Sequence, residues 1–192
     1  MLEDIIISKT RIKLLELFLT NPGKIYHVRE LVRRVDEEIN SVRRELAHLE
    51  KRGLFTKEPR GNRLYYAMRK DYPLYHELMA IFAKTRGFGL GIIKNKAKLG
   101  KLKYVALSGL FARYLPKGDP EKVDILVIGE VVLPELALLI RSEESRRGEE
   151  INYTVMTEEE FSFRKKRRDP FIVSILSGSR VMIVGDEEEL LR

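Results

Sequence analysis

Apolar residues recur at helical spacing in three stretches of the first 52 residues, with capping or turn residues between them. The first predicted helix starts after Ser8, whose hydroxyl suits a helix N-terminus, and ends at Leu19 before an Asn-Pro-Gly turn. The second covers Val28–Val35, and the third follows an acidic turn at 36–38 that suits its N-terminus and runs to Arg52. The apolar stripes consist of Ile12, Leu15, Phe18 and Leu19, of Val28, Leu31, Val32 and Val35, and of Ile39, Val42, Leu46 and Leu49. Three such helices predict one shared core.

A shorter alternation of apolar and polar residues follows Gly53. Residues 54–58 and 63–67 predict two strands around a turn at 59–62. The residues expected to face inward are Phe55, Leu64 and Tyr66. The stretch Pro73–Lys84 then predicts a helix, and glycines at 87, 89 and 91 are expected to break the chain before a lysine-rich segment. The apolar face of that helix consists of Leu74, Leu78, Ile81 and Phe82.

From Tyr104 onward, apolar strands alternate with helices, which is the pattern of an α/β domain. The expected strands are 104–107, 123–128, 151–156 and 180–184, and the expected helices are 133–147, 158–168 and 171–176. The sequence therefore predicts three parts. They are an α+β domain over residues 1–70, a helical connector over 71–102, and an α/β domain with a small mixed sheet over 103–192.

The composition indicates a soluble protein with unevenly spread charge. The 192 residues are 44% hydrophobic and 34% charged and include no cysteine. No apolar run reaches the roughly 20 residues that span a bilayer. The N-terminus is acidic and lacks the basic and then apolar layout of a signal peptide, so a cytoplasmic protein without membrane contact is expected. The net charge of +7 divides into +6 for residues 1–70, +4 for 71–102 and −3 for 103–192, as expected where the N-terminal half meets a polyanion. The lack of Gln and the abundance of Glu, Lys and Arg also fit a heat-adapted source.

The polar residues of the third helix are of the types that bind DNA. Arg bonds guanine bidentately, Asn bonds adenine, and Ser or Lys holds phosphates. Off the apolar stripe lie Asn40, Ser41, Arg43, Arg44, Ala47, His48 and Lys51. At the hairpin tip, Arg60, Asn62 and Arg63 suit phosphate or minor-groove contacts. All of these except Ala47 are candidate ligands of double-stranded DNA, and an ordinary solvated helix face is the alternative.

Three helices followed by a basic-tipped hairpin resemble a winged helix-turn-helix. The runs Leu46-Ala47-His48-Leu49-Glu50-Lys51-Arg52-Gly53-Leu54-Phe55 and Gly61-Asn62-Arg63-Leu64-Tyr65-Tyr66 are similar to winged-helix repressors of the ArsR-like group, over residues 8–70. The resemblance implies a transcriptional regulator with its third helix in the major groove and its wing on the backbone.

The same resemblance bears on partners and metals. In winged-helix regulators the helix after the wing often mediates dimerisation, so residues 73–84 are expected to form a homodimer or to dock on their own domain. Metal-sensing members of the group need Cys or clustered His and carboxylate ligands. His27, His48 and His76 are scattered along this chain, so neither a metal nor a cofactor is expected.

The C-terminal part resembles the minimal nucleotidyltransferases of the DNA polymerase β superfamily. The resemblance rests on Ser108-Gly109-Leu110-Phe111-Ala112-Arg113-Tyr114 and Val123-Asp124-Ile125-Leu126-Val127-Ile128-Gly129, with later pieces at 152–155 and 169–171. That family carries G-S-x-A-x-G and then D-x-D, which implies a cradle for the triphosphate and two carboxylates for divalent metals. Here Leu110 stands at the family's serine, Tyr114 at its second glycine and Lys122 at its first aspartate, which leaves Asp124 alone. The sequence therefore predicts a nucleotidyltransferase-like domain without catalysis.

Together these features predict a DNA-binding transcriptional regulator that is not an enzyme. Its second domain would serve effector binding, dimerisation or partner recruitment. Two alternatives remain open: a nucleotidyltransferase tethered to nucleic acid, and an adaptor that recruits the basal transcription machinery. The basic run at 164–168 and the acidic tail at 186–189 are expected to be mainly solvated, with flanking DNA as a second possibility for the basic run.

Overall fold

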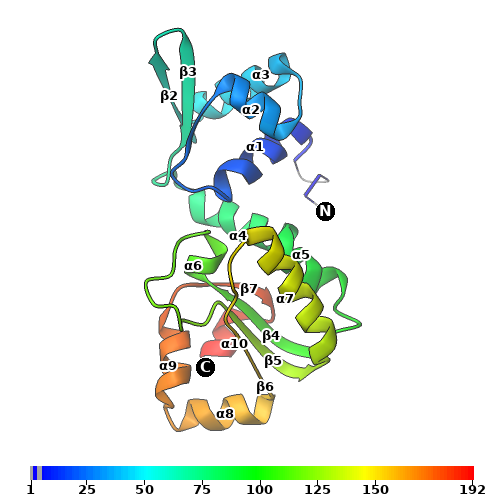
Figure 1. Ribbon diagram of the computed structural model, residues 1–192. Helices are drawn as coiled ribbons and strands as arrows, with labels where there is room; N and C mark the ends of the chain where they lie inside the picture. Colours follow the sequence, from blue (N-terminus) through cyan, green and yellow to red (C-terminus); the bar gives the residue numbers. More distant parts are fainter. Residues whose placement is uncertain (1, 4–5) are drawn as a thin grey trace. The chain divides into compact units, whose positions relative to one another are not determined.

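Residues 2–3 and 6–192 are described by a computed structural model, which has a mixed α+β fold. The chain divides into two units, Met1–Phe82 and Ala83–Arg192, so the boundary falls inside the segment 71–102 for which the sequence predicted a connector. The described residues form ten helices and two small sheets, one of three strands and one of four (Figure 1). None of the described helices is both long enough and apolar enough to cross a membrane.

Unit 1 consists of three helices and a three-stranded antiparallel sheet, followed by a fourth helix that runs across the unit boundary. The elements are α1 (Lys9–Leu19), β1 (Ile25–His27), α2 (Val28–Val35), α3 (Ile39–Lys51), β2 (Phe55–Arg60), β3 (Arg63–Met68) and α4 (Tyr75–Thr85). The strand order is β1-β3-β2, so β3 is central and β2 and β3 form a long hairpin. The predicted helices and hairpin are therefore confirmed, and the short strand β1 is an addition that the sequence did not predict.

Local hydrogen bonds explain where these helices begin and end. Ser8 caps α1 as predicted, because its hydroxyl accepts a hydrogen bond from the amide of Arg11. The Nδ1 atom of His27 accepts from the amide of Glu30 and so caps α2. The acidic turn does not cap α3 as expected: Glu38 occupies the N-terminal position without a side-chain capping bond. Its neighbour Glu37 instead binds Lys13 of α1.

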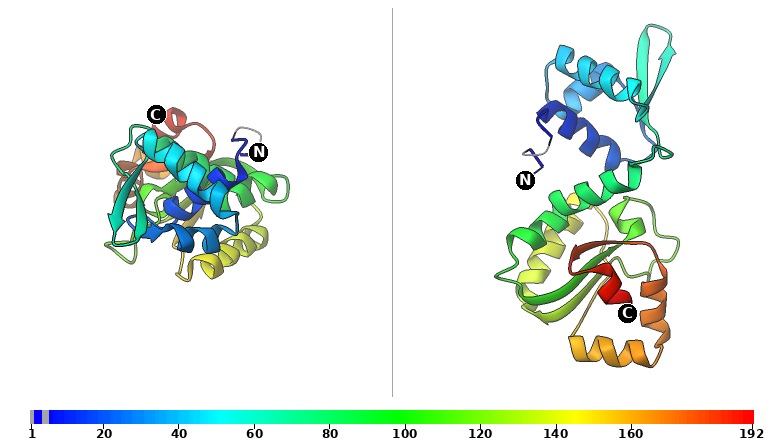
Figure 2. Two further views of the ribbon diagram at one scale, coloured as in Figure 1. Left: turned by 90° about the horizontal axis from the view of Figure 1, so that it is seen from above. Right: turned by 180° about the vertical axis from the view of Figure 1, so that it is seen from behind.

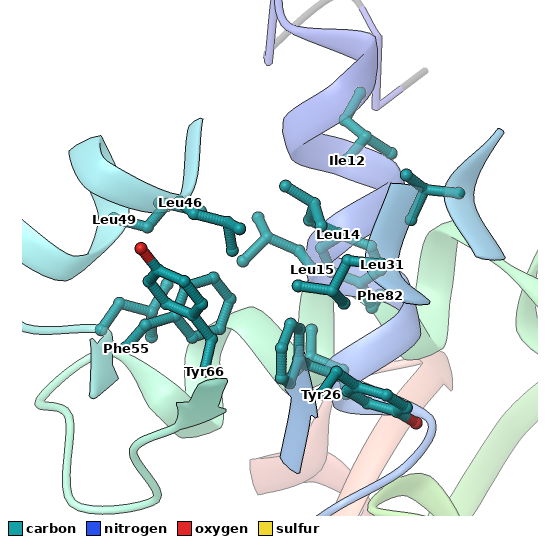
Figure 3. Close-up of a cluster of buried hydrophobic side chains, with 14 of the residues drawn as sticks. Ile12, Leu14, Leu15, Tyr26, Leu31, Leu46, Leu49, Phe55, Tyr66 and Phe82 are labelled. Atoms are coloured by element: carbon teal, nitrogen blue, oxygen red, sulfur yellow. The ribbon is translucent and has the colours of Figure 1, made fainter. Parts of the chain in front are cut away.

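The core of unit 1 lies between the helices and the inner face of the sheet (Figure 3). Phe18 is 1% exposed, and its ring packs 5.2 Å from that of Tyr26 and 4.6 Å from that of Phe55, centroid to centroid. The predicted inward position of Leu64 is wrong, since this side chain is 43% exposed. Tyr66 shares its face of β3 and is buried, but Leu64 lies nearer the hairpin tip, opposite Pro59, where the hairpin extends past the core.

The apolar face predicted for helix α4 is confirmed in part, since Phe82 is buried and Leu78 packs against the core of unit 1. Tyr75, Met79 and Phe82 are buried in the core of unit 1, whereas Leu74 is 54% exposed and Ile81 is 40% exposed. The stripe at 75, 79 and 82 has helical spacing, so the choice between two apolar stripes was decided by the neighbours of the helix. The buried stripe serves its own unit.

The glycine-rich segment is a helix, which corrects the prediction of a chain break. Helix α5 (Gly87–Lys94) includes all three glycines. A Cβ at Gly91 would lie 3.2 Å from Leu139 of α7 (Leu133–Arg147), and a Cβ at Gly89 would lie 2.0 Å from the carbonyl oxygen of Ala83. These glycines are explained by close packing, because no larger residue fits between the segments.

The remainder of unit 2 is a four-stranded mixed sheet with helices on both faces. Its further elements are β4 (Gly100–Ser108), α6 (Gly109–Ala112), β5 (Ile125–Val131), β6 (Tyr153–Met156), α8 (Glu158–Lys166), α9 (Pro170–Ser177), β7 (Arg180–Val184) and α10 (Glu187–Leu191). The strand order is β6-β5-β4-β7; β5 and β6 are parallel and joined through α7, and the other pairs are antiparallel. The sequence missed α10, whose N-terminus Asp186 caps and whose Leu190 is fully buried.

Strand alternation divides the core of unit 2 between the two faces of the sheet (Figure 2). On β4, Val105 and Leu107 pack with side chains of α5 and α7, whereas Tyr104 and Ala106 pack with those of α8, α9 and α10. Successive side chains of a strand point to opposite faces, so an unbroken apolar strand requires a helical layer on each side.

Candidate nucleic-acid interface

The outer face of α3 carries most of the polar residues that the sequence singled out. Val42, Leu46 and Leu49 are buried on the inner side of the helix. On the opposite side, the exposed residues Asn40, Arg44, Ala47 and Lys51 follow one another at spacings of four, three and four, and Arg43 and His48 flank that line. The result is a solvent-facing strip whose three cations lie on one surface.

A buried ionic cluster fixes α3 against α1 and so sets the direction in which this strip faces. Glu45 is 5% exposed and accepts hydrogen bonds from the hydroxyl of Ser8 at 2.7 Å and from Nε of Arg11 at 2.8 Å. Burial raises the pKa of Glu45, and the hydrogen bonds from Ser8 and Arg11 lower it by more, so the carboxylate is stabilised in its charged form. This buried contact holds α3, and with it the side chains of its outer face, in a fixed orientation relative to α1.

Ser41 belongs to the α1–α3 contact and not to the outer strip. Its hydroxyl lies 2.9 Å from that of Thr10, which in turn donates to Glu37. Ser41 is half-buried, so among the predicted DNA ligands it is the one that the structure turns toward the protein.

The hairpin tip carries Arg60, Asn62 and Arg63, all exposed. The guanidinium of Arg60 forms two hydrogen bonds with the carboxylate of Glu58, at 2.8 and 2.9 Å, and lies over the ring of Tyr65. The hydrogen bonds from Arg60 lower the pKa of Glu58, so the pair is charged at neutral pH. Arg60 is thus paired within its own hairpin, whereas Arg63 takes part in no ion pair with the residues that the structure describes.

Two hollows adjoin the hairpin, and arginines line both. One of about 430 Å³ lies where α2, α3 and β3 meet, and its polar lining comes from His27, Arg29, Arg43, Asn62 and Arg63. The other, of about 560 Å³, shares three of these residues and adds Arg33 of α2. No Asp or Glu lines either hollow. We call this surface, together with the outer strip of α3, the cationic face; its unpaired cations are Arg29, Arg33, Arg43, Arg44, Lys51 and Arg63.

Six carboxylates of unit 1 pair with cations that lie outside the cationic face. Ion pairs join Glu45 to Arg11, Glu37 to Lys13, Glu30 to Arg34, Glu50 to Lys57, Glu58 to Arg60 and Asp71 to Arg69. Within the described part of the chain, none of the six cations of the cationic face takes part in an ion pair. A cluster of like charges without partners is unfavourable for the free protein and is relieved by a bound polyanion.

The sequence did not single out His27, Arg29 or Arg33 as candidates. Arg29 and Arg33 are four residues apart on α2, so they lie on one side of that helix. Only the folding of the hairpin beside α2 brings them next to Arg63. The available signal was their position off the apolar stripe of α2, a signal that any solvated helix also gives.

Unit 2 has a cavity of about 570 Å³ at the end of β4, where Ser108 and Gly109 start α6 and Asp124 precedes β5. Asp124 is 2% exposed; its carboxylate accepts a hydrogen bond from the amide of Asn152 at 2.9 Å and forms an ion pair with Lys117. Both contacts are made to Oδ2, so this oxygen already has two protein partners. The described residues hold no group of three or more His, Asp or Glu side chains that could bind a metal ion.

Comparison of the chain with protein-family models, with curated proteins and with solved structures found no match.

Proposed function

We propose that the protein is a DNA-binding transcriptional regulator that reads double-stranded DNA through the cationic face of unit 1. The observation that carries the proposal is the set of six cations on the cationic face that take part in no ion pair within the described part of the chain; four of them line hollows in which no Asp or Glu is found. Basic side chains gathered on one face, without internal partners, are the electrostatic footprint of a nucleic-acid-binding protein.

In this proposal unit 1 is a winged helix-turn-helix, with α2 and α3 as the helix pair and the β2–β3 hairpin as the wing. The outer strip of α3 enters the major groove, where Arg43, Arg44 and Asn40 meet base edges. Arg29, Arg33 and Arg63 hold the phosphates beside that groove, and Lys51 holds a phosphate at the far end of the helix. The contact between Glu45 and α1 supports the proposal because it holds the reading helix in one orientation.

We also propose that unit 2 is a nucleotidyltransferase-like domain that has lost catalysis. The mixed sheet and the position of Ser108 and Gly109 at the start of α6 support the fold assignment. The ion pair of Asp124 with Lys117 supports the loss of catalysis, because a carboxylate that is buried and neutralised by lysine is a poor ligand for Mg²⁺.

Selection of bound duplexes from a random pool, followed by fluorescence anisotropy on the selected sequence, tests DNA reading. Arg43→Ala or Arg44→Ala is expected to weaken binding by about 1–3 kcal/mol if that side chain contacts a base. Arg69→Ala is the matched control, since Arg69 is an exposed arginine of unit 1 that is paired with Asp71. If both variants bind as tightly as the wild type, the assignment of α3 as the reading helix is wrong.

A magnesium-dependent transfer assay with labelled nucleoside triphosphates tests the second part of the proposal. We expect no incorporation of label above the background of a buffer blank. Transfer by the wild type that disappears in Asp124→Asn would show that unit 2 is a working nucleotidyltransferase, provided that the variant unfolds at the wild-type temperature.

A further inference from the structure

The outer side of α8 carries an aromatic side chain, Phe163, that is largely exposed. Phe161 points into the core and is 5% exposed, whereas Phe163, two residues on, is 59% exposed. Exposed residues lie four positions before and after Phe163: Glu159 in the first turn of the helix and Arg167, the residue that caps its C-terminus in helical conformation. They therefore share its side of the helix, and the guanidinium of Arg167 lies 5.3 Å from the centre of the Phe163 ring. Figure 1 shows α8 along the rim of unit 2.

The charges three to five residues from Phe163 are opposite in sign on its two sides. Three glutamates, 158–160, fill the first turn, and three cations, 166–168, lie at the same distances on the other side of the phenylalanine. In the described part of the chain, Glu159 and Arg167 take part in no ion pair, whereas Glu160 is bound to Arg164. The end charges match the helix dipole, but dipole matching does not require an exposed phenylalanine midway between them.

We propose that α8 is a self-association surface, on which a second copy of the chain places its own α8 in antiparallel orientation across a twofold axis at Phe163. In that arrangement each residue faces the one that lies equally far from Phe163 on the partner. The two Phe163 rings then stack on each other, and each Glu159 faces Arg167 of the partner, giving two equivalent ion pairs. A parallel arrangement would oppose glutamate to glutamate and arginine to arginine, so the charge pattern selects the antiparallel pair.

The size of the surface sets the strength of the association. Helix α8 has nine residues and is therefore roughly 14 Å long, so two such helices bury less than a standard interface does. The dimer is accordingly a weak one that forms as the protein concentration rises. The proposal does not rest on DNA binding, and it places the dimer on unit 2 and not on α4, whose apolar stripe is used inside unit 1.

Sedimentation equilibrium of the full chain over a wide range of protein concentration tests the proposal. The wild type is expected to pass from monomer to dimer, and Phe163→Ala is expected to weaken the dimer at least about tenfold, as loss of a central aromatic anchor does. Leu138→Ala is the matched control, because Leu138 of α7 is 58% exposed and should not affect association. Both side chains are more than half exposed, so both variants fold, which thermal unfolding checks.

Charge reversal distinguishes the antiparallel pair from any other use of this helix. Glu159→Arg alone and Arg167→Glu alone each place two like-charge contacts in the twofold interface and should abolish the dimer. The double variant Glu159→Arg/Arg167→Glu exchanges the partners and should restore it.

Three outcomes would overturn the proposal. They are a wild type that stays monomeric at every concentration, a dimer that Phe163→Ala leaves unchanged, and a double variant no better than the single ones. Weaker binding of Arg167→Glu to a DNA duplex, with unchanged association, would assign the basic end of α8 to nucleic acid instead.

Discussion

The dependence of DNA binding on salt offers a quantitative test of the cationic face. Each phosphate that a protein cation neutralises releases condensed counterions, and the logarithm of the binding constant then falls with the logarithm of the salt concentration at about 0.9 per phosphate. The four cations that are assigned to phosphates, Arg29, Arg33, Arg63 and Lys51, therefore predict a slope of about −3.6. The slope counts neutralised phosphates, so it does not require knowledge of the preferred sequence.

The perturbation is the double variant Arg29→Ala/Arg63→Ala, which removes one cation from α2 and one from the hairpin. Both side chains line the hollow beside the hairpin, and neither caps a helix or fills the core. The slope is expected to become less steep by about 2, and binding at low salt should weaken equally for all duplexes, since phosphates carry no sequence information.

The assay is fluorescence anisotropy of a labelled random-sequence duplex, titrated with protein at several salt concentrations. Arg60→Ala serves as an internal comparison, because Arg60 is already paired with Glu58, and its removal should change the slope by less than half as much as the removal of an unpaired arginine. An unchanged slope in the double variant, or an equal change in Arg60→Ala and Arg63→Ala, would refute the inference that unpaired cations define the binding surface.

Three further predictions concern the stability of the units, measured by urea unfolding. Glu143→Ala should cost about 3–5 kcal/mol, because Glu143 is 3% exposed and its loss removes the carboxylate 2.7 Å from the buried guanidinium of Arg147, which keeps only the exposed Glu149 at 3.9 Å. Burial raises the pKa of Glu143, but the hydrogen bonds and charges of Arg146 and Arg147 together lower it below its ordinary value. The stability that the Glu143 carboxylate adds is therefore fully present above the ordinary glutamate pKa and is lost as the pH falls through the lowered pKa. Unfolding of the wild type at a series of pH values from neutral to acid should show this loss. Gly89→Ala should destabilise unit 2 by at least about 1–3 kcal/mol, because the new Cβ would lie 2.0 Å from the carbonyl oxygen of Ala83. Gly178→Ala is the control and should be nearly neutral, because the atom nearest to its Cβ would lie 3.8 Å away. Phe18→Ala should cost about 3–5 kcal/mol through the loss of its two ring contacts, and a smaller loss would show that the core collapses around the gap.

Local patterns along the sequence were sufficient for most of the secondary structure. The helices Val28–Val35 and Leu133–Arg147 and the strand Arg180–Val184 have the predicted bounds, because apolar periodicity and capping residues act over a few positions and need no distant partner. The sequence also identified Arg43, Arg44 and Asn40 as outward-facing residues of α3, since the buried stripe of an amphipathic helix determines its opposite side.

Tertiary structure decided the cases in which two local patterns competed. Helix α4 has two apolar stripes, and packing in the core of unit 1 buries the stripe formed by Tyr75, Met79 and Phe82. Three glycines within five residues locally favour a break, yet the segment is a helix whose glycines allow close packing against α7 and against the backbone of α4.

The candidate interface divides in the same way. Sequence alone could place a basic helix and a basic hairpin in the chain, because residue type and helical spacing are local properties. It could not show that Glu58 neutralises Arg60, that Ser41 faces α1, or that Arg29 and Arg33 join Arg63, because each of these depends on which side chains the fold brings within a few ångströms. The chain thus determined by itself which charges it carries, and folding determined which of them remain unpaired, since pairing is a matter of distance in space and not of position along the sequence.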